Sequence, residues 1–283
     1  GPISHVLKYM QPDGYWSKPG PGYSPKYRST VWALILLGQL GASASQDERI
    51  AQACGYLLDH AYSEGGYFSH NGQAHRTFDC LQGNLCWALT ALGVDDPRLT
   101  RAFEWMARSL TGEGVAPKSD TTASLRYYDL NCGPIFRCAA NDDLPCAWGA
   151  AKVMQAFSLL PKDRVTAPIQ HAIETGADFI FSVDLTSASW PYRKEINRGW
   201  WKFGFPVYYV TDLLQIADFM VALGYGKDPR MKLLRQFIQD KADAQGQWKL
   251  ENEYNAKTWG NFGNKGEPNK WVTLRALRVL TSA

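Results

Sequence analysis

The chain has 283 residues and a net charge of +3, with 45% hydrophobic, 20% charged and 13% aromatic residues. This mild charge balance indicates neither a nucleic-acid-binding surface nor a polybasic membrane patch. No apolar run reaches the length of a transmembrane helix. The length suffices for one large core, so we expect a single domain over residues 1–283.

The start of the chain resembles the scar that a protease leaves when a purification tag is removed. Gly1 and Pro2 form that scar, so the natural N-terminus is expected to lie upstream. Because no signal peptide opens the sequence, the expected location is the cytoplasm.

A turn rich in glycine and aromatic residues recurs along the chain, and each copy is followed by a polar loop and a long apolar segment. The copies lie at residues 11–16, 65–68, 112–115, 187–190 and 245–248. One such unit cannot bury its own hydrophobic face, so the units must stack or close into a ring.

Two kinds of helix are predicted to alternate. Residues 31–37 are apolar on every side, which indicates a helix buried all round, and comparable runs cover residues 85–92, 147–160, 210–223 and 271–280. Residues 47–60, 97–110, 165–181 and 229–240 mix charged and apolar residues with helical period and are expected to be half exposed. We therefore predict an all-α fold, an α/α toroid of about five hairpins with inner buried and outer amphipathic helices, the first hairpin incomplete.

The links between inner and outer helices also repeat. Gly93 followed by Asp96 and Pro97 is matched by Gly224 followed by residues 228–229. Glycine suits the position after a helix, aspartate the N-cap of the next, and proline its first turn. These links therefore predict antiparallel helical hairpins.

The turns carry a recognisable motif. Gln-x-Asp-Gly-x-Trp at residues 11–16 and Gln-Gly-x-Trp at residues 245–248 resemble the repeat of squalene and hopene cyclases. The chain also resembles uncharacterised bacterial members of that superfamily, whose fold is shared by the β subunits of protein prenyltransferases. The resemblance implies a soluble protein with a central cavity for an isoprenoid or similar apolar molecule, and it leaves a partner subunit open. It does not fix the reaction, because one toroid hosts several chemistries.

Cysteines are the sharpest chemical signal. Cys80 begins the second inner helix, while Cys132, Cys138 and Cys146 lead into the third. Successive inner helices of a toroid are neighbours, so these sites are expected to meet at one mouth of the cavity. A helix N-terminus favours the thiolate, the form that binds metal or acts as a nucleophile. We therefore predict a zinc site at these four cysteines, or a catalytic role for Cys146.

Nearby residues add further zinc ligand types. Asp79 precedes Cys80, and His70 and His75 lie in the same approach loop. Protein prenyltransferases are similar in placing an Asp, a Cys and a His around zinc at this mouth. They separate the Asp and Cys by one residue, whereas Asp79 and Cys80 are adjacent. At the position of the family's His, this chain has Asp212 or Lys270.

Two other interpretations of the cysteines stay open. In the first, the thiols are reduced and buried, because cysteine is among the most buried residues. In the second, they form disulfides, which requires an oxidising compartment. Cys54 and Cys86 lie inside predicted helices and are expected to be core residues.

An aromatic cluster leads into the fourth inner helix at the same mouth. A cyclase needs a wall of this kind, since aromatic faces stabilise a carbocation. Ordinary packing of a large helical core explains the cluster equally well. The candidate wall residues are Trp200, Trp201, Phe203, Tyr208 and Tyr209.

Asp143 and Asp212 are candidate proton donors. Class II terpene cyclases use an Asp-x-Asp-Asp motif, of which this chain keeps the paired carboxylates as Asp142 and Asp143. Two adjacent carboxylates can push their pKa values apart. Asp212 precedes a buried helix beside the aromatic cluster. Helix capping for the pair, and a Lys or Arg partner for Asp212, are the structural alternatives.

Basic side chains on the same side are candidates for holding a diphosphate. Arg126 and Lys202 are the first choices, and surface solvation is the alternative for any one of them. The other candidates are Lys26, Arg28, Arg137, Lys257 and Lys270. There is no phosphate-cradling glycine loop or dinucleotide fingerprint, so no nucleotide cofactor is expected.

The leading hypothesis is an enzyme that acts on an isoprenoid or comparable apolar molecule in the toroid, with a cysteine-rich, zinc-bearing mouth. A metal-free class II-type cyclase with packed cysteines is the first alternative. A non-catalytic toroid that binds a lipid or a peptide is the second. The sequence leaves the substrate and the oligomeric state open.

Overall fold

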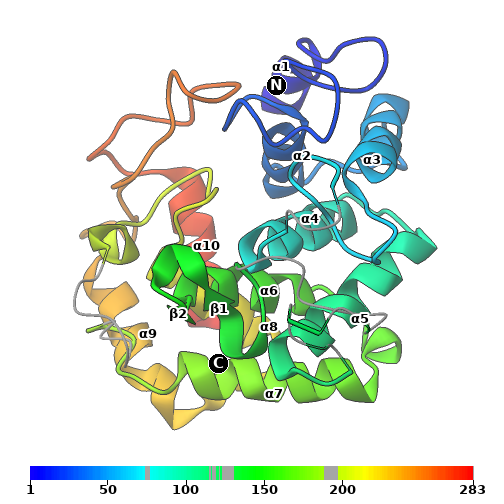
Figure 1. Ribbon diagram of the computed structural model, residues 1–283. Helices are drawn as coiled ribbons and strands as arrows, with labels where there is room; N and C mark the ends of the chain where they lie inside the picture. The colour runs from blue at the N-terminus through cyan, green and yellow to red at the C-terminus, as the bar shows by residue number, and fades with distance from the viewer. Residues whose placement is uncertain are drawn as a thin grey trace.

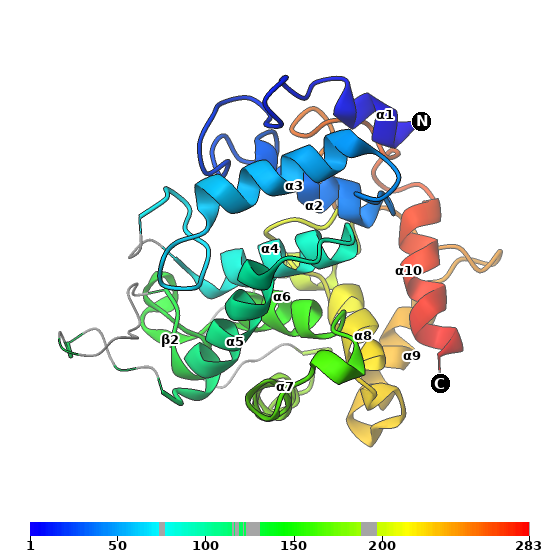
Figure 2. The same cartoon turned by 90° about the vertical axis from the view of Figure 1, so that its right-hand side faces the viewer.

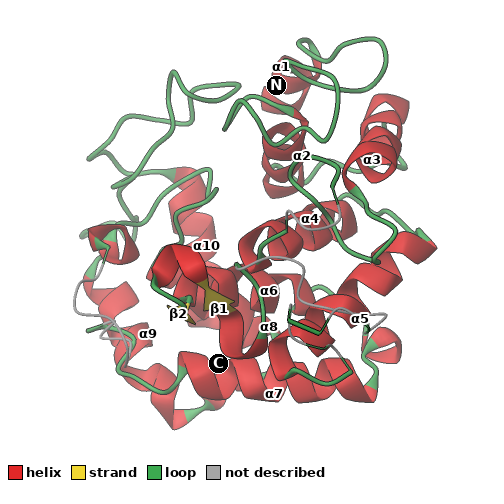
Figure 3. Cartoon of the chain, in the orientation of Figure 1, coloured by secondary structure: helices red, strands yellow, loops and turns green. Residues whose placement is uncertain are grey.

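A computed structural model describes residues 1–73, 77–114, 116, 119–120, 122, 131–187 and 197–282. Among these residues α-helices dominate, and the paired strands form one two-stranded antiparallel sheet (Figure 3). The all-α class predicted from the sequence is confirmed.

The helices belong to two layers. The inner helices are α2 (Thr30–Gln39), α4 (Asp79–Ala91), α6 (Ala147–Phe157), α8 (Leu213–Ala222) and α10 (Lys270–Thr281). The outer helices are α1 (Pro2–Leu7), α3 (Glu48–Ala61), α5 (Pro97–Thr111), α7 (Ala167–Ile180) and α9 (Lys232–Asp240).

Short elements fill the connections. The sheet pairs β1 (Arg137–Cys138) with β2 (Leu144–Pro145). The 3-10 helices are η1 (Pro134–Phe136), η2 (Ala139–Asn141), η3 (Lys162–Arg164), η4 (Arg198–Trp201), η5 (Tyr225–Lys227) and η6 (Pro229–Met231).

The two layers follow the predicted α/α arrangement. Neighbouring inner helices pack in chain order, α2 on α4, α4 on α6, α6 on α8 and α8 on α10. Each outer helix from α3 to α9 packs on the inner helix that precedes it (Figures 1 and 2). The links work as predicted: Gly93 has a positive φ of +83°, and the Asp96 side chain accepts a hydrogen bond from the Arg98 N–H at 2.8 Å.

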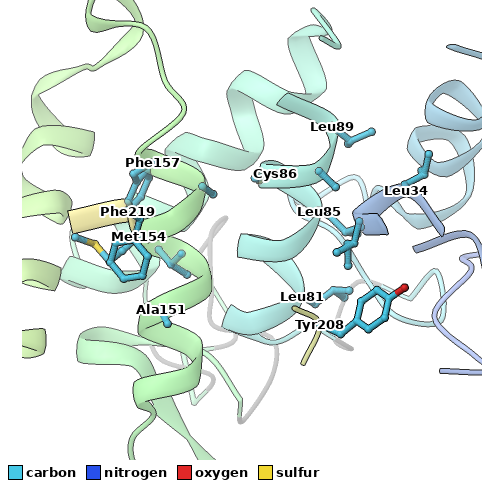
Figure 4. Close-up of a cluster of buried hydrophobic side chains, with 14 of the residues drawn as sticks. Leu34, Leu81, Leu85, Cys86, Leu89, Ala151, Met154, Phe157, Tyr208 and Phe219 are labelled. Atoms are coloured by element: carbon cyan, nitrogen blue, oxygen red, sulfur yellow. The ribbon is translucent and has the colours of Figure 1, made fainter. Parts of the chain in front are cut away.

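Burial differs between the layers in the way the patterns predict. In α2 every residue from Thr30 to Leu37 is buried, whereas α9 buries only Leu234 and Ile238. Side chains of α2, α4, α6 and α8 meet in the centre of the molecule, where Leu34, Leu85 and Phe219 belong to one cluster (Figure 4). The inner layer therefore forms the hydrophobic core.

The backbones of α4 and α6 approach each other closely at Gly83. A Cβ added at Gly83 would lie 2.2 Å from the backbone carbonyl carbon of Lys152, closer than any real contact. Glycine at this position lets the two helix backbones touch. The contact also fixes the N-terminal ends of α4 and α6 side by side.

A segment before α8 lies between the first and last inner helices. The Gln39 amide on α2 donates to the Val207 carbonyl at 2.7 Å, and the Phe205 ring stacks on Trp271 of α10 with centroids 4.7 Å apart. The Arg275 guanidinium on α10 donates to the Gly204 carbonyl at 2.8 Å. Residues 203–209 therefore link α10 to α2.

Loop contacts also hold the two ends of the helical series together. The Arg28 guanidinium donates to the Ala256 carbonyl at 2.8 Å, and the Trp259 indole N–H donates to the Arg28 carbonyl at 2.9 Å. The Tyr9 ring stacks on Trp259 with centroids 4.7 Å apart. No helix among the described residues has the length and apolarity needed to cross a bilayer.

Gly83→Ala is expected to lower the free energy of unfolding by about 3 kcal/mol or more, because the added methyl group forces the α4 and α6 backbones apart. The matched control is Gly55→Ala on α3, where no atom lies within 4 Å of the new Cβ. We expect that control to raise stability by about 0.5–1 kcal/mol, the usual gain from glycine to alanine inside a helix. Urea unfolding measures both changes, and equal stability of Gly83→Ala and wild type would disprove the close approach.

Candidate functional site

A cavity with a volume of about 220 Å³ lies at the N-terminal ends of α4 and α6. Three of the predicted cysteines line it together with aromatic and small side chains, and one carboxyl group. The lining residues are Tyr23, Phe78, Asp79, Cys80, Asn131, Cys138, Ala140, Cys146, Gly149 and Tyr209. The sequence prediction that cysteines of two neighbouring inner helices meet at one mouth is therefore correct for Cys80, Cys138 and Cys146.

Local structure places each of these groups. Asp79 is the first residue of α4, and Cys146 is the N-cap of α6. The β1–β2 pairing sets Cys138 opposite residue 144, just before the N-cap. A parallel bridge between Phe78 and Asn131 attaches the start of α4 to the segment that leads into the hairpin.

Asp79 carries the most unusual environment in the cavity. Its side chain belongs to a residue only 4% exposed, and its Oδ2 has no hydrogen-bond partner among the described residues. Burial raises the pKa of the Asp79 carboxyl well above its usual range, and the neighbouring Cys146 sulfur raises it further. A helix N-terminus favours the ionised form, but desolvation outweighs it here. Burial therefore favours the protonated form of this carboxyl, which lies at the wall of the cavity.

The thiols are not the thiolates that the helix N-termini predict. Burial raises the pKa of Cys80. A hydrogen bond to Cys146 raises the pKa of Cys138, and burial adds to the effect. These raised pKa values oppose the thiolate form that the helix N-termini were expected to favour, through burial at Cys80 and through the interaction with Cys146 and burial at Cys138. All six cysteines are outside disulfides.

Cys146 differs in its surroundings from the other two lining thiols. Its Sγ accepts the Gly149 N–H at 3.4 Å and so caps α6. The Cys138 thiol donates to the Asn131 side-chain oxygen at 3.5 Å, and its interaction with Cys146 raises the pKa of Cys138.

The remaining members of the predicted zinc set lie elsewhere or outside the described residues. Cys132 is buried and is not among the residues that line the cavity. His70 packs edge-on against Phe78, with ring centroids 5.6 Å apart. His75 lies outside the described residues, and so does Arg126 of the predicted anion site. Among the residues with described positions, no group of three or more His, Cys, Asp or Glu is placed to hold a metal ion.

Aromatic rings form the apolar part of the cavity. Tyr209 is the member of the predicted wall that lines it, and its ring meets Trp148 edge-on at 5.3 Å. Tyr23 and Phe78 meet edge-on at 5.5 Å. The Lys26 ammonium lies 4.6 Å from the Tyr209 ring centroid and 5.6 Å from that of Tyr23. The rings of Tyr209 and Tyr23 thus both contact the Lys26 ammonium.

The other wall candidates are packed away from the cysteines, as the core-packing alternative describes. Trp200, Phe203 and Tyr208 are buried in the hydrophobic core. The Tyr208 hydroxyl is hydrogen-bonded to Thr258. The Trp201 indole N–H donates to a backbone carbonyl at 2.6 Å. None of these four is among the residues that line the cysteine cavity.

Two more predicted residues line a second, narrow recess. Lys202 is exposed and borders this recess together with Asp212. Asp212 is the N-cap of α8, where its carboxylate accepts the Gln215 N–H at 2.7 Å. Arg275 on α10 forms a two-bonded ion pair with the same carboxylate, at 2.7 and 3.0 Å. This buried pair is the structural alternative that the sequence left open for Asp212.

Asp143, the other predicted acid, lies on the exposed turn between η2 and β2. It forms an ion pair with Arg137 at 3.1 Å, and both side chains are 56% exposed. It is not among the residues that line the cavity. Neither predicted acid therefore stands where the three cysteines meet.

Sequence reasoning missed several residues of this region. Tyr23 precedes the first inner helix and carries no motif, and Asn131 gave no signal either. Lys152 is fully buried on α6, and burial lowers its pKa to about 7. Its ammonium donates to the Gln215 side-chain oxygen at 2.7 Å. A single lysine in the otherwise apolar stretch 147–154 is the signal by which it could have been found.

Comparisons with known proteins find a similar fold among solved structures. The sequence matches no protein-family model and no curated protein. Among solved structures, it is similar to a variant of the type II terpene cyclase MstE from Scytonema, in complex with its substrate geranylgeranyl dihydroxybenzoate. The match covers 98% of this chain and 69% of that one at 13% identity, with a TM-score of 0.49. At these values the likeness says nothing about the reaction.

Asp79→Asn is expected to stabilise the fold increasingly as the pH rises from about 4, the usual pKa of an unfolded aspartate. The folded pKa of Asp79 is raised, so the proton on this carboxyl favours folding fully below pH ~4. That contribution is lost as the pH rises through the folded pKa, at ~1.4 kcal/mol for each unit of pH. Asparagine keeps the shape and has no such dependence. Urea unfolding of both proteins at several pH values measures the difference.

The control for this titration is Asp143→Asn, the same chemical change on an exposed turn. A stability difference between wild type and Asp79→Asn that stays constant from pH 4 to pH 7 would contradict the raised pKa.

Proposed function

We propose that the chain is an enzyme that binds a small apolar, unsaturated molecule of the isoprenoid class in the cavity at α4 and α6, and that Asp79 protonates it. The observation that carries the proposal is the Asp79 carboxyl: it is buried, burial raises its pKa well above the usual range, and its Oδ2 has no partner among the described residues. Buried polar groups are normally paired. An orphaned acid at the wall of a cavity is therefore a candidate for contact with a ligand.

The raised pKa suits an acid rather than a base. A carboxyl with an ordinary pKa near 4 is ionised at neutral pH and has no proton to give. Loss of water around Asp79 raises the pKa of its carboxyl and so favours the protonated form that a general acid needs. General acids contribute typically 10²–10⁴-fold to a rate when they are held in the protonated form against the reacting atom.

The remaining lining groups suit a neutral, apolar molecule. Burial raises the pKa of Cys80, and the interaction with Cys146, together with burial, raises that of Cys138, so both sulfurs favour the uncharged thiol. Rings of Tyr23, Phe78 and Tyr209 provide apolar surface. Aromatic faces also attract cations, as the Lys26 ammonium over Tyr209 shows. The same faces favour the carbocation that protonation of an alkene creates.

The proposed step balances without a metal or a co-substrate. The alkene π pair takes the Asp79 proton, a C–H bond forms, and a carbocation and the Asp79 carboxylate result. The cation then loses a different proton to the carboxylate, which restores the acid. The net reaction is an isomerisation or a cyclisation.

Asp79→Asn tests the proposal directly. Wild-type protein is incubated with geraniol and with farnesol, binding is followed by tryptophan fluorescence, and products are identified by gas chromatography with mass detection. We expect Asp79→Asn to lower turnover at least ~100-fold, in the range of lost general acids, with probe affinity changed only a few-fold. Asp143→Asn, which removes an exposed carboxylate, is expected to leave turnover unchanged.

Other outcomes overturn the proposal in distinct ways. Binding of the probes without any product would favour a non-catalytic binding protein. Absence of binding would reject the isoprenoid class for this cavity. Loss of turnover in Asp143→Asn but not in Asp79→Asn would move the acid to the exposed turn.

A zinc site remains a separate proposal for the cysteines, and it has its own test. Elemental analysis of protein purified without a metal-affinity column is the measurement. A zinc site at Cys80, Cys138 and Cys146 predicts about one equivalent of zinc, which is lost in Cys146→Ser, because structural and catalytic zinc sites need three or four ligands. Metal below a tenth of an equivalent, with six thiols titrated after denaturation, would rule it out.

A further inference from the structure

We propose that Asn84 is a ligand-binding residue, whose amide pairs with a neutral oxygen group, such as a hydroxyl, on the molecule bound in the cavity. Asn84 lies on α4, is 5% exposed, and makes no side-chain hydrogen bond among the described residues. It lines a narrow inner recess that adjoins the cavity. This inference rests on the proposed function and narrows its substrate class to an isoprenoid with an oxygen group.

The inner recess and the cavity share a wall. The residues that line both spaces are Tyr23, Phe78, Cys80 and Tyr209. Helices α2 and α4 supply the residues that line the recess alone, and Asn84 is the polar one among them. A molecule that fills the cavity and extends into the recess therefore meets an apolar surface with one amide on it.

The unpaired side chain of Asn84 is an exception among the buried amides of the described residues. The others are all hydrogen-bonded, and they belong to Gln82, Asn141, Gln215 and Asn269. Burying an amide without a partner costs free energy, and buried polar groups are normally paired. The missing partner of Asn84 is therefore expected on a bound molecule.

The helical repeat explains why Asn84 faces this space. Asn84 lies one turn after Cys80, which lines both the cavity and the recess, and residues at this spacing share a face of the helix. Asp79 is the first residue of the same helix. At 1.5 Å a residue, Asp79 and Asn84 are ~7.5 Å apart along the helix axis. A ligand that contacts both residues has its oxygen group at one end and its reactive double bond farther along the chain.

An amide suits a neutral oxygen group better than an anion. Its carbonyl accepts a hydrogen bond and its NH₂ group donates, so it can pair with a hydroxyl in either direction. A phosphate or carboxylate would bring a charge into the recess, and no Lys or Arg is among the described residues that line either space. The ligand class is therefore an isoprenoid alcohol or ketone.

The experiment compares two probes that differ by one oxygen atom: geraniol, and the hydrocarbon that has a hydrogen atom in place of its hydroxyl. Tryptophan fluorescence of the full chain measures binding, and Trp32 lines the recess. We expect wild type to bind geraniol ~10-fold more tightly, about the effect of one hydrogen bond to a buried group that otherwise stays unpaired. In Asn84→Leu, which replaces the amide by an apolar group of similar shape, we expect the order to reverse, because the hydroxyl then has no partner.

Thermal unfolding without ligand gives a second readout. Asn84→Leu is expected to raise the Tm by about 2–4 °C, because it removes an unpaired buried amide without opening a cavity. Asn264→Leu is the matched control, since it makes the same chemical change on an exposed loop. That control is expected to keep the wild-type order of the two affinities.

The outcomes that contradict the inference differ from those that contradict the proposed function. Equal affinity of wild type for the two probes would overturn the inference and leave isoprenoid binding in the cavity intact. A lower Tm of Asn84→Leu, or failure of this variant to fold, would show that the amide has a structural partner, such as a buried water molecule, and would overturn it as well. Absence of binding of either probe would reject the proposed function and this inference together.

Discussion

The contact between α4 and α6 at Gly83 determines where the cavity and its acid lie. The absence of a side chain there lets the two helix backbones touch, with a hypothetical Cβ only 2.2 Å from the Lys152 carbonyl carbon. Two helices that touch one turn into their length have adjacent N-terminal ends. Asp79 starts one of these helices and Cys146 caps the other. The cavity, its acid and its thiols are therefore consequences of one packing contact.

Desolvation is the common cause of the chemistry at these helix ends. The same burial raises the pKa values of Asp79 and Cys80 and lowers that of Lys152. Each group is pushed toward its uncharged form, as a medium that solvates ions poorly requires. Helix dipoles oppose this for Asp79, with the smaller effect. Asp79 is thus a carboxyl with a raised pKa beside aromatic rings, which is the basis of the proposed proton transfer.

A buried polar network explains why Asp212, an acid predicted from the sequence, does not line the cavity. Asp212 binds Arg275 of α10 and caps α8, and Gln215 of α8 accepts from Lys152 of α6. The network thus joins three neighbouring inner helices across the core. Breaking one partner of such a buried pair leaves an uncompensated charge. Asp212 therefore holds neighbouring inner helices together, whereas the acid that lines the cavity is Asp79.

The sequence by itself determined the helices, their alternation between two layers and the meeting of three cysteines, because these follow from local periodicity and from the order of neighbouring units. It could not determine which side chains turn into the cavity. Tyr23 and Asn131 reach it from loops without a motif, while Trp200, Phe203 and Tyr208 pack into the core instead. It also could not give the direction in which the pKa values of Asp79 and Cys80 shift, since burial depends on groups distant in sequence. Tertiary structure decided both, because the exclusion of water is a property of the assembled ring rather than of any segment.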